Sequence, residues 1–229
     1  MKTIGLIGGM SWESTVTYYE QLNTAAKQQL GGLHSAKVLL YSVDFYEVER
    51  CMSAGDWDGA AHILIDAAKR LERGGADFLL IGTNTLHKVA PQVQQAVMIE
   101  LLHIADAVAD ALLAKGVHTA ALLGTRYTME QDFYTARLSE RGIQVTVPNE
   151  AERGWLNSTI FDELCLGVAT DDAKRRMKAL CERLYADGAG GIILGCTELG
   201  MLITQTDTAV PLFDSVVLHA RAAAQHAFE

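Results

Sequence analysis

Short apolar segments alternate along the chain with longer segments in which apolar residues recur every three or four positions. Most of the short segments are apolar throughout, which is typical of strands covered by helices on both faces. Strands are expected at residues 3–7, 37–43, 78–81, 99–103, 119–123, 143–147, 192–194 and 210–213. Helices are expected at residues 14–29, 57–73, 105–114, 130–141, 154–166 and 171–187. This order of elements predicts an α/β fold with parallel sheets.

The two halves of the sequence resemble each other, and this internal repeat is their most informative feature. A shift of 116 positions places Thr3, Leu6, Gly8, Tyr18 and Leu22 on Thr119, Leu122, Gly124, Tyr134 and Leu138. A shift of 113 positions places Arg70, Leu71, Gly75, Ala76, Gly82 and Leu86 on Arg183, Leu184, Gly188, Ala189, Gly195 and Leu199. Because the two shifts are nearly equal, we favour a duplication over the general likeness of any two strand–helix units.

A duplication predicts two similar Rossmann-like lobes with parallel sheets, related by a pseudo-twofold axis. We expect residues 1–104 and 208–229 to form the first lobe and residues 105–207 to form the second. Ligands of such sheets bind at the carboxyl ends of the strands, so the active site is expected in the cleft between the lobes. The repeat also pairs Thr83 with Cys196, each directly after the glycine that ends its strand. We therefore expect these two side chains to face each other across the cleft.

Composition and charge narrow the classes of partner. The chain has 229 residues, of which 49% are hydrophobic, and 28 acidic residues against 19 basic ones give a net charge of −9. This charge argues against nucleic acid or an anionic membrane as a partner, although a local pocket can still bind an anionic substrate. No apolar run approaches the roughly 20 residues of a membrane span, and the first residues resemble a strand more than a signal peptide. A cytoplasmic protein with reduced thiols is the expectation.

One of the four cysteines has a distinctive context. The cysteines form no C-x-x-C pair and no finger-like spacing with histidine, so no metal site is expected. Cys51, Cys165 and Cys181 fall in helical segments, where a structural role is expected. Cys196 follows a strand end, and we expect it to begin a helix whose N–H groups and dipole lower the pKa of the thiol. The sequence therefore predicts a reactive thiol at Cys196.

Polar residues also follow the other strand ends. Thr83, Asn84 and Thr85 offer hydroxyl and amide groups beside backbone N–H groups, which suits a carboxylate or phosphate, unless one of them caps a helix. The glycine turns before Met10 and Thr125 can also present N–H groups to an anion. The spacing of the first glycines is not that of a dinucleotide-binding motif.

Four further residues are weaker candidates. Asp44 either reaches the cleft or caps the segment that follows it. His87 and His103 can orient a ligand, but partly exposed histidines without such a role are the simpler interpretation. Arg126 either meets a distal carboxylate of the substrate or is a solvated surface side chain.

The chain resembles the aspartate/glutamate racemase family of cofactor-independent amino-acid racemases. The resemblance is carried by IGLIGGMSWEST at 4–15, TNT at 83–85, LLGTRYTM at 122–129 and IILGCTELGML at 192–202, so it extends over both lobes. The last motif is specific and complete. The first active-site motif of the family normally has a cysteine where this chain has Thr83. The arrangement is similar to that of a subgroup of broad-specificity or L-aspartate/L-glutamate-selective racemases, which pair one threonine with one cysteine.

This resemblance implies racemisation without pyridoxal phosphate or another cofactor, with Thr83 and Cys196 as the catalytic residues. In the two-thiol scheme of the family, one thiolate removes the α-proton and the opposite thiol returns a proton to the other face. The substrate-binding residues it implies are Met10, Asn84, Thr85, Thr125 and Thr197. The resemblance also implies a homodimer. Because a threonine hydroxyl is a poor base, either a relay assists Thr83 or one enantiomer is strongly preferred, and we hypothesise the second.

Two other functions remain open. A single-cysteine decarboxylase or isomerase of a small dicarboxylic acid needs only one thiol, which Cys196 supplies. A non-enzymatic amino-acid or dicarboxylate binding protein is the third alternative, in which Cys196 is unreactive. The segment 154–167 contains no Lys or Arg to hold a distal carboxylate, so the sequence leaves the preferred amino acid open.

Overall fold

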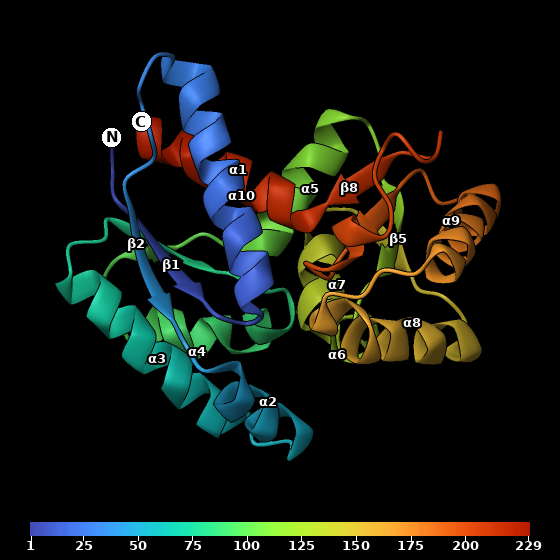
Figure 1. The fold of residues 1–229 in the computed structure, drawn as a ribbon, viewed down its shortest axis with the longest axis horizontal. Coiled ribbons are helices and arrows are strands. Elements are labelled where there is room, and N and C mark those ends of the chain that lie inside the picture. Colours follow the sequence, from blue (N-terminus) through green and yellow to red (C-terminus); the bar gives the residue numbers. More distant parts are fainter. The chain divides into compact units, whose positions relative to one another are not determined.

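The computed structural model describes all 229 residues and divides them into two compact units. Residues 1–104 and 219–229 form the first unit, and residues 105–218 form the second (Figure 1). The chain returns to the first unit at residue 219, and the expected return at 208 is corrected accordingly. The reason is that the strand Leu212–Asp214 pairs with the strand Ile192–Leu194 and therefore stays in the second unit.

The first unit is built on a parallel sheet with the strand order β2-β1-β3-β4. The strands are β1 (Ile4–Gly8), β2 (Val38–Ser42), β3 (Phe78–Ile81) and β4 (Glu100–Leu101). The helices are α1 (Trp12–Leu30), α2 (Phe45–Ser53), α3 (Trp57–Arg73), the 3-10 helix η1 (Thr85–Val89), α4 (Ala90–Gln95) and α10 (Ser215–Phe228). Both α1 and α3 pack against β1, and they lie on opposite faces of the sheet (Figure 1). This double cover explains why β1 and β3 are buried along their whole length.

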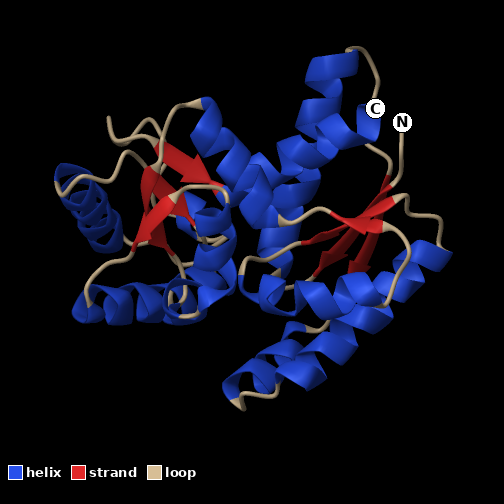
Figure 2. Ribbon diagram, turned by 180° about the vertical axis from the view of Figure 1, so that it is seen from behind, coloured by secondary structure: helices blue, strands red, loops and turns tan.

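The second unit repeats this design with the strand order β6-β5-β7-β8, again parallel. The strands are β5 (Thr119–Leu123), β6 (Gln144–Thr146), β7 (Ile192–Leu194) and β8 (Leu212–Asp214). The helices are α5 (Ile104–Ala114), α6 (Arg126–Glu130), α7 (Asp132–Glu140), α8 (Glu150–Asp162), η2 (Leu164–Leu166), α9 (Asp171–Ala186) and η3 (Leu199–Met201). Figure 2 shows helices around each red sheet.

The predicted repeat is confirmed by the strand order and by the register. Gly5 of β1 pairs with Leu79 of β3, and the two sequence shifts carry this pair onto Ala121 of β5 and Ile192 of β7, which pair in the same way. The prediction of an α/β fold with two similar lobes is therefore confirmed.

Each unit contains one helix that directly follows the last strand of the other sheet. Helix α10 follows β8 but belongs mostly to the first unit, where the N–H of Lys2 donates to the carbonyl of Ala227 at 2.8 Å. Helix α5 follows β4 but belongs mostly to the second unit, where Arg137 binds both carboxylate oxygens of Asp106, at 2.7 and 2.8 Å. In both places, the helix that follows the last strand of one sheet therefore belongs mostly to the other unit.

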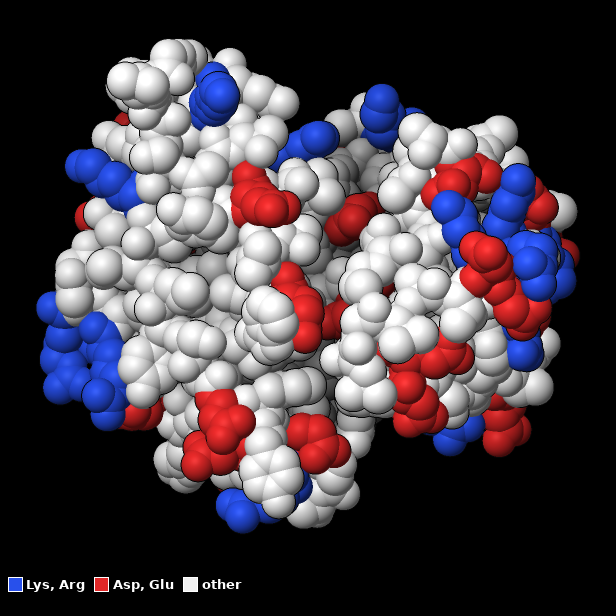
Figure 3. Space-filling model, in the orientation of Figure 1, with Lys and Arg blue, Asp and Glu red and all other residues white.

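None of the helices has both the length and the apolar character that a membrane crossing requires. On the face drawn in Figure 3, acidic side chains lie between the basic ones, and the basic side chains do not merge into one extended patch.

Candidate active site

Cys196 lies directly after β7 in a turn that requires glycine beside it. The N–H of Gly195 donates to the carbonyl of Leu123 at 2.6 Å, which holds the turn against β5. A Cβ atom on Gly195 would lie 2.6 Å from a methyl group of Leu122, closer than packed atoms approach. The strand end therefore fixes the backbone of Cys196, whose side chain is buried.

Thr83 has the equivalent position in the first unit. The N–H of Gly82 donates to the carbonyl of Ile7 at 2.8 Å, and the two sequence shifts convert this bond into the one between Gly195 and Leu123. Thr83 is also buried. The two residues predicted to be catalytic thus follow the same strand–glycine turn, each in its own unit. That their side chains face each other stays a prediction.

The environment of Cys196 raises the pKa of its thiol well above the ordinary value. Burial is the main cause, and the neighbouring carboxylate of Glu198 adds to it. The expected lowering by a helix terminus is wrong, because only the three-residue 3-10 helix η3 follows, beginning at Leu199. So short a helix has no substantial dipole to stabilise a thiolate.

A buried carboxylate next to Cys196 accepts two hydrogen bonds. The Cys196 thiol donates to Oε2 of Glu198 at 3.0 Å, and the hydroxyl of Thr197 donates to the same oxygen at 2.6 Å. Glu198 is buried. The sequence analysis noted this carboxylate but gave it no role; its position two residues after the cysteine was the signal. The arrangement gives the thiol an acceptor for its proton.

The loop after β3 contains the next group of predicted residues. Asn84 precedes η1 but makes no side-chain capping bond to it, so Asn84 is not the residue of this loop that caps the helix. Thr85 is the first residue of η1, and both side chains are buried. His87 is also buried, with 1% of its surface exposed, so the expectation of a partly exposed histidine is wrong.

The other two predicted binding residues lie in the turns after β1 and β5. Met10 is buried in the first turn, and Ser11 then caps α1. Thr125 is buried and caps α6, where its hydroxyl accepts a hydrogen bond from the N–H of Thr128 at 3.4 Å. Both residues therefore lie at carboxyl ends of strands, as the sequence predicts.

The remaining candidates have structural partners. Asp44 caps α2 by accepting from the N–H of Tyr46 at 3.1 Å. The guanidinium of Arg126 lies 3.6 Å from the carboxylate of Glu130 and is half-exposed. Cys181 is buried in α9, where burial raises the pKa of its thiol to about 12. An inert structural thiol is what the sequence predicted there.

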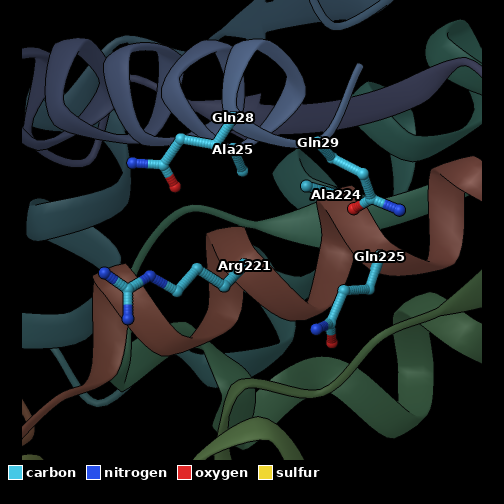
Figure 4. A pocket seen from close by; sticks show the side chains of 6 residues that line it. All are labelled: Ala25, Gln28, Gln29, Arg221, Ala224 and Gln225. Carbon is cyan, nitrogen blue, oxygen red and sulfur yellow. The ribbon is translucent and has the colours of Figure 1, made fainter. Parts of the chain in front are cut away.

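A surface groove on the first unit contains none of the predicted residues. It lies between the C-terminal half of α1 and helix α10 (Figure 4). Its lining residues are Ala25, Gln28, Gln29, Arg221, Ala224 and Gln225. The groove is far along α1 from the turn that holds Met10, so we assign it no part in the site.

Residues 7–223 match the model of the Asp/Glu/hydantoin racemase family. The chain belongs to this family. A racemase is an isomerase, so the protein belongs to that class of enzyme.

Relatives of this racemase match along nearly the whole chain. RacX of Bacillus subtilis (strain 168), a broad-specificity amino-acid racemase, is 25% identical over 220 residues, which cover 93% of this chain and 92% of RacX. A crystal structure from Yersinia pestis, assigned as an Asp/Glu racemase, is 48% identical with a TM-score of 0.93 and full coverage of both chains. An aspartate racemase homologue from Pyrococcus horikoshii OT3 is 40% identical with a TM-score of 0.88, also with full coverage of both chains.

Proposed function

We propose that this racemase inverts aspartate or glutamate by removing and returning the α-proton without a cofactor, with Cys196 and Thr83 on the two faces of the α-carbon. The observation that supports this most directly is the buried Cys196 thiol, which donates to Glu198 directly after a strand end. Family membership over residues 7–223 supports the reaction type.

On the Cys196 face, the proton moves in two balanced steps. The S–H bond of Cys196 breaks as an O–H bond forms on Oε2 of Glu198, which leaves a thiolate and a neutral carboxylic acid. The thiolate then takes the α-proton, and the electron pair of the broken C–H bond delocalises into the α-carboxylate of the substrate. Because burial raises the pKa of the thiol, Cys196 carries its proton at neutral pH and can return it to a carbanion, whereas it needs Glu198 to take that proton when it acts as a base.

The developing charge on the α-carboxylate requires hydrogen-bond donors. We propose that the turns after the strands supply them through backbone N–H groups and through Asn84, Thr85 and Thr125, with Met10 as an apolar contact. Thr197 joins these donors when its hydroxyl turns from Glu198 to the substrate. Preorganised donors of this kind stabilise a carbanion as its charge moves onto oxygen. Their places at the carboxyl ends of strands favour this role.

Thr83 is the weaker partner because its hydroxyl does not ionise near neutral pH. We propose that the Cys196 face therefore works faster than the Thr83 face, so that one enantiomer is the better substrate.

The choice between aspartate and glutamate is part of the proposal: structural relatives bear both names, whereas RacX is described as broad in specificity. We also propose, from the resemblance, that the enzyme is a homodimer in the cytoplasm.

The decisive test is α-proton exchange in D₂O with the D- and L-forms of aspartate and glutamate. Proton NMR measures loss of the α-signal, and chiral chromatography measures inversion. Exchange with inversion is the expected result. Absence of both with all four substrates, together with release of CO₂ from a small dicarboxylic acid, would replace the racemase proposal by a decarboxylase.

A further inference from the structure

Three buried histidines gather in the first unit beside the Thr83 loop. The ring of His87 lies 4.5 Å from that of His103 and 5.7 Å from that of His219, measured between centroids. The exposed fractions are 1%, 8% and 0% in that order. Buried imidazoles need hydrogen-bond partners, and the partners of His87 and His219 connect this cluster to Thr83.

The hydrogen bonds of His87 fix its charge and tautomer. Its Nδ1 lies 2.7 Å from the carbonyl oxygen of Thr83, which can only accept, so Nδ1 carries the hydrogen and donates. Its Nε2 accepts from the backbone N–H of Ile104 at 3.2 Å, so this nitrogen is bare. The imidazole is therefore neutral, and its two nitrogens connect the backbone of Thr83 to the backbone of Ile104.

We propose that His87 is a positioning residue that sets the direction of the Thr83 side chain, an inference that rests on the proposed function. The backbone is held on both sides of Thr83: before it by Gly82, whose N–H donates to Ile7 at 2.8 Å, and after it by His87. Because threonine is β-branched, its side-chain rotamer is restricted once the backbone is fixed. His87 thereby determines where the hydroxyl points.

A second imidazole supports the segment that anchors His87. His219 donates from Nε2 to the carbonyl of Leu102 at 2.9 Å, and its Nδ1 accepts from the hydroxyl of Tyr18 at 2.8 Å. Leu102 lies two residues before Ile104, whose N–H binds His87. Residues 104 and 219 are also where the first unit ends and resumes. The network thus ties the Thr83 loop to both connections of the chain.

Two substitutions separate the two hydrogen bonds of His87. Asparagine places an amide N–H near the position of Nδ1, so His87→Asn retains the donor to Thr83 and loses the acceptor for Ile104. Glutamine reaches the position of Nε2 with its oxygen, so His87→Gln retains the acceptor and loses the donor. Thr83→Ala serves as the reference because it removes the hydroxyl itself.

The readout is the ratio of inversion to α-proton exchange in D₂O, measured with the enantiomer that Cys196 deprotonates. Exchange needs only the Cys196 face, whereas inversion also needs Thr83. We expect His87→Gln to lower the ratio about tenfold toward that of Thr83→Ala, while His87→Asn stays within about threefold of the wild type. Tyr18→Phe, which keeps the ring and removes the donor to His219, should lower it less.

Other results overturn the inference. An unchanged ratio in His87→Gln, or an equal fall in both His87 variants, would show that the donor to Thr83 does not position it. A parallel fall in exchange, inversion and melting temperature would show a purely structural histidine. If His87→Gln does not fold, an unchanged ratio in Tyr18→Phe has the same meaning. Failure of the racemase proposal differs from all of these, because the wild type would then show no exchange.

Discussion

The carboxylate of Glu198 lies next to the Cys196 thiol and accepts its hydrogen bond. Burial is the main reason that the pKa of the thiol is raised, and the carboxylate 3.0 Å from the sulfur acts in the same direction. The motif at residues 192–202 could be identified from the sequence. The direction in which the pKa of Cys196 changes could not, because it depends on burial and on the shortness of η3. The same holds for His87, because one of its two contacts is with Ile104, 17 residues further along the chain.

The first prediction concerns the pH at which Cys196 becomes reactive. Because the pKa of the folded thiol is raised, the thiolate forms only at alkaline pH, above the value of about 8.5 for a free cysteine. Alkylation of Cys196 by iodoacetamide, followed by peptide mass spectrometry, should therefore rise at higher pH than alkylation of a free thiol. Glu198→Gln removes the nearby negative charge and should move this rise to lower pH. Faster labelling of Cys196 than of a free thiol at pH 7 would contradict the prediction.

The second prediction concerns the identity of the group at residue 83. Thr83→Cys should raise kcat on the poorer enantiomer by about tenfold or more, because a thiol ionises far more easily than a hydroxyl. Cys196→Ala should abolish turnover of both enantiomers. Initial rates with each pure enantiomer provide the measurement, and Thr83→Ser is the matched control that keeps a hydroxyl. An unchanged enantiomer ratio in Thr83→Cys would count against the asymmetry of the two faces.

Among the elements, the buried strands follow from the sequence and several helices do not. All eight expected strands exist. The continuous apolar runs of β1, β3, β5 and β7 reflect cover on both faces, whereas β2, β4 and β6 are partly exposed. No bounds were predicted for helices α2, α4, α6 and α10, although Cys51 was placed in a helical segment and lies in α2. Helix α10 is an alanine-rich segment, and four of its alanines are buried. The expected helix at 154–166 begins earlier, at Glu150, because Asn149 and Glu152 form a capping box.

The third prediction compares equivalent glycines at the ends of β3 and β7. A Cβ on Gly195 would lie 2.6 Å from Leu122 and 2.9 Å from the carbonyl of Leu123, whereas one on Gly82 would meet its nearest atom at 3.0 Å. Gly195→Ala should therefore lower the free energy of unfolding by about 1–3 kcal/mol, and Gly82→Ala by less. Denaturant titration with both variants gives the values. Equal destabilisation would show that the strand ends adjust more easily than these contacts indicate.

For the whole molecule, the decisive property is that the C-terminal helix completes the first unit. Helix α10 carries His219 and four buried alanines, and its Ala227 accepts from Lys2. The sequence could not place the return of the chain, because β8 and α10 are adjacent in sequence but belong mostly to different units. The place where the chain returns depends on contacts between distant segments, such as those of Ala227 with Lys2 and of His219 with Leu102.

The fourth prediction follows from that placement. A chain that stops after Asp214 should lose the cooperative thermal unfolding of the full protein, because the first unit loses a buried helix face. A chain that stops after Phe228, which removes Glu229 alone, is the control and should unfold like the full protein. Circular dichroism melting curves compare the two. A cooperative transition at an unchanged temperature after truncation at Asp214 would show that α10 is dispensable.

The exchanged helices also bear on how such a gene arose. Before duplication, half of this sequence would have encoded one sheet followed by a helix equivalent to α5 or α10, and in the present chain that helix belongs mostly to the next unit. Two copies of the ancestral polypeptide would have completed each other by domain swapping. A fusion of two such genes would make that association independent of concentration, and it would allow residues 83 and 196 to differ, as Thr83 and Cys196 do.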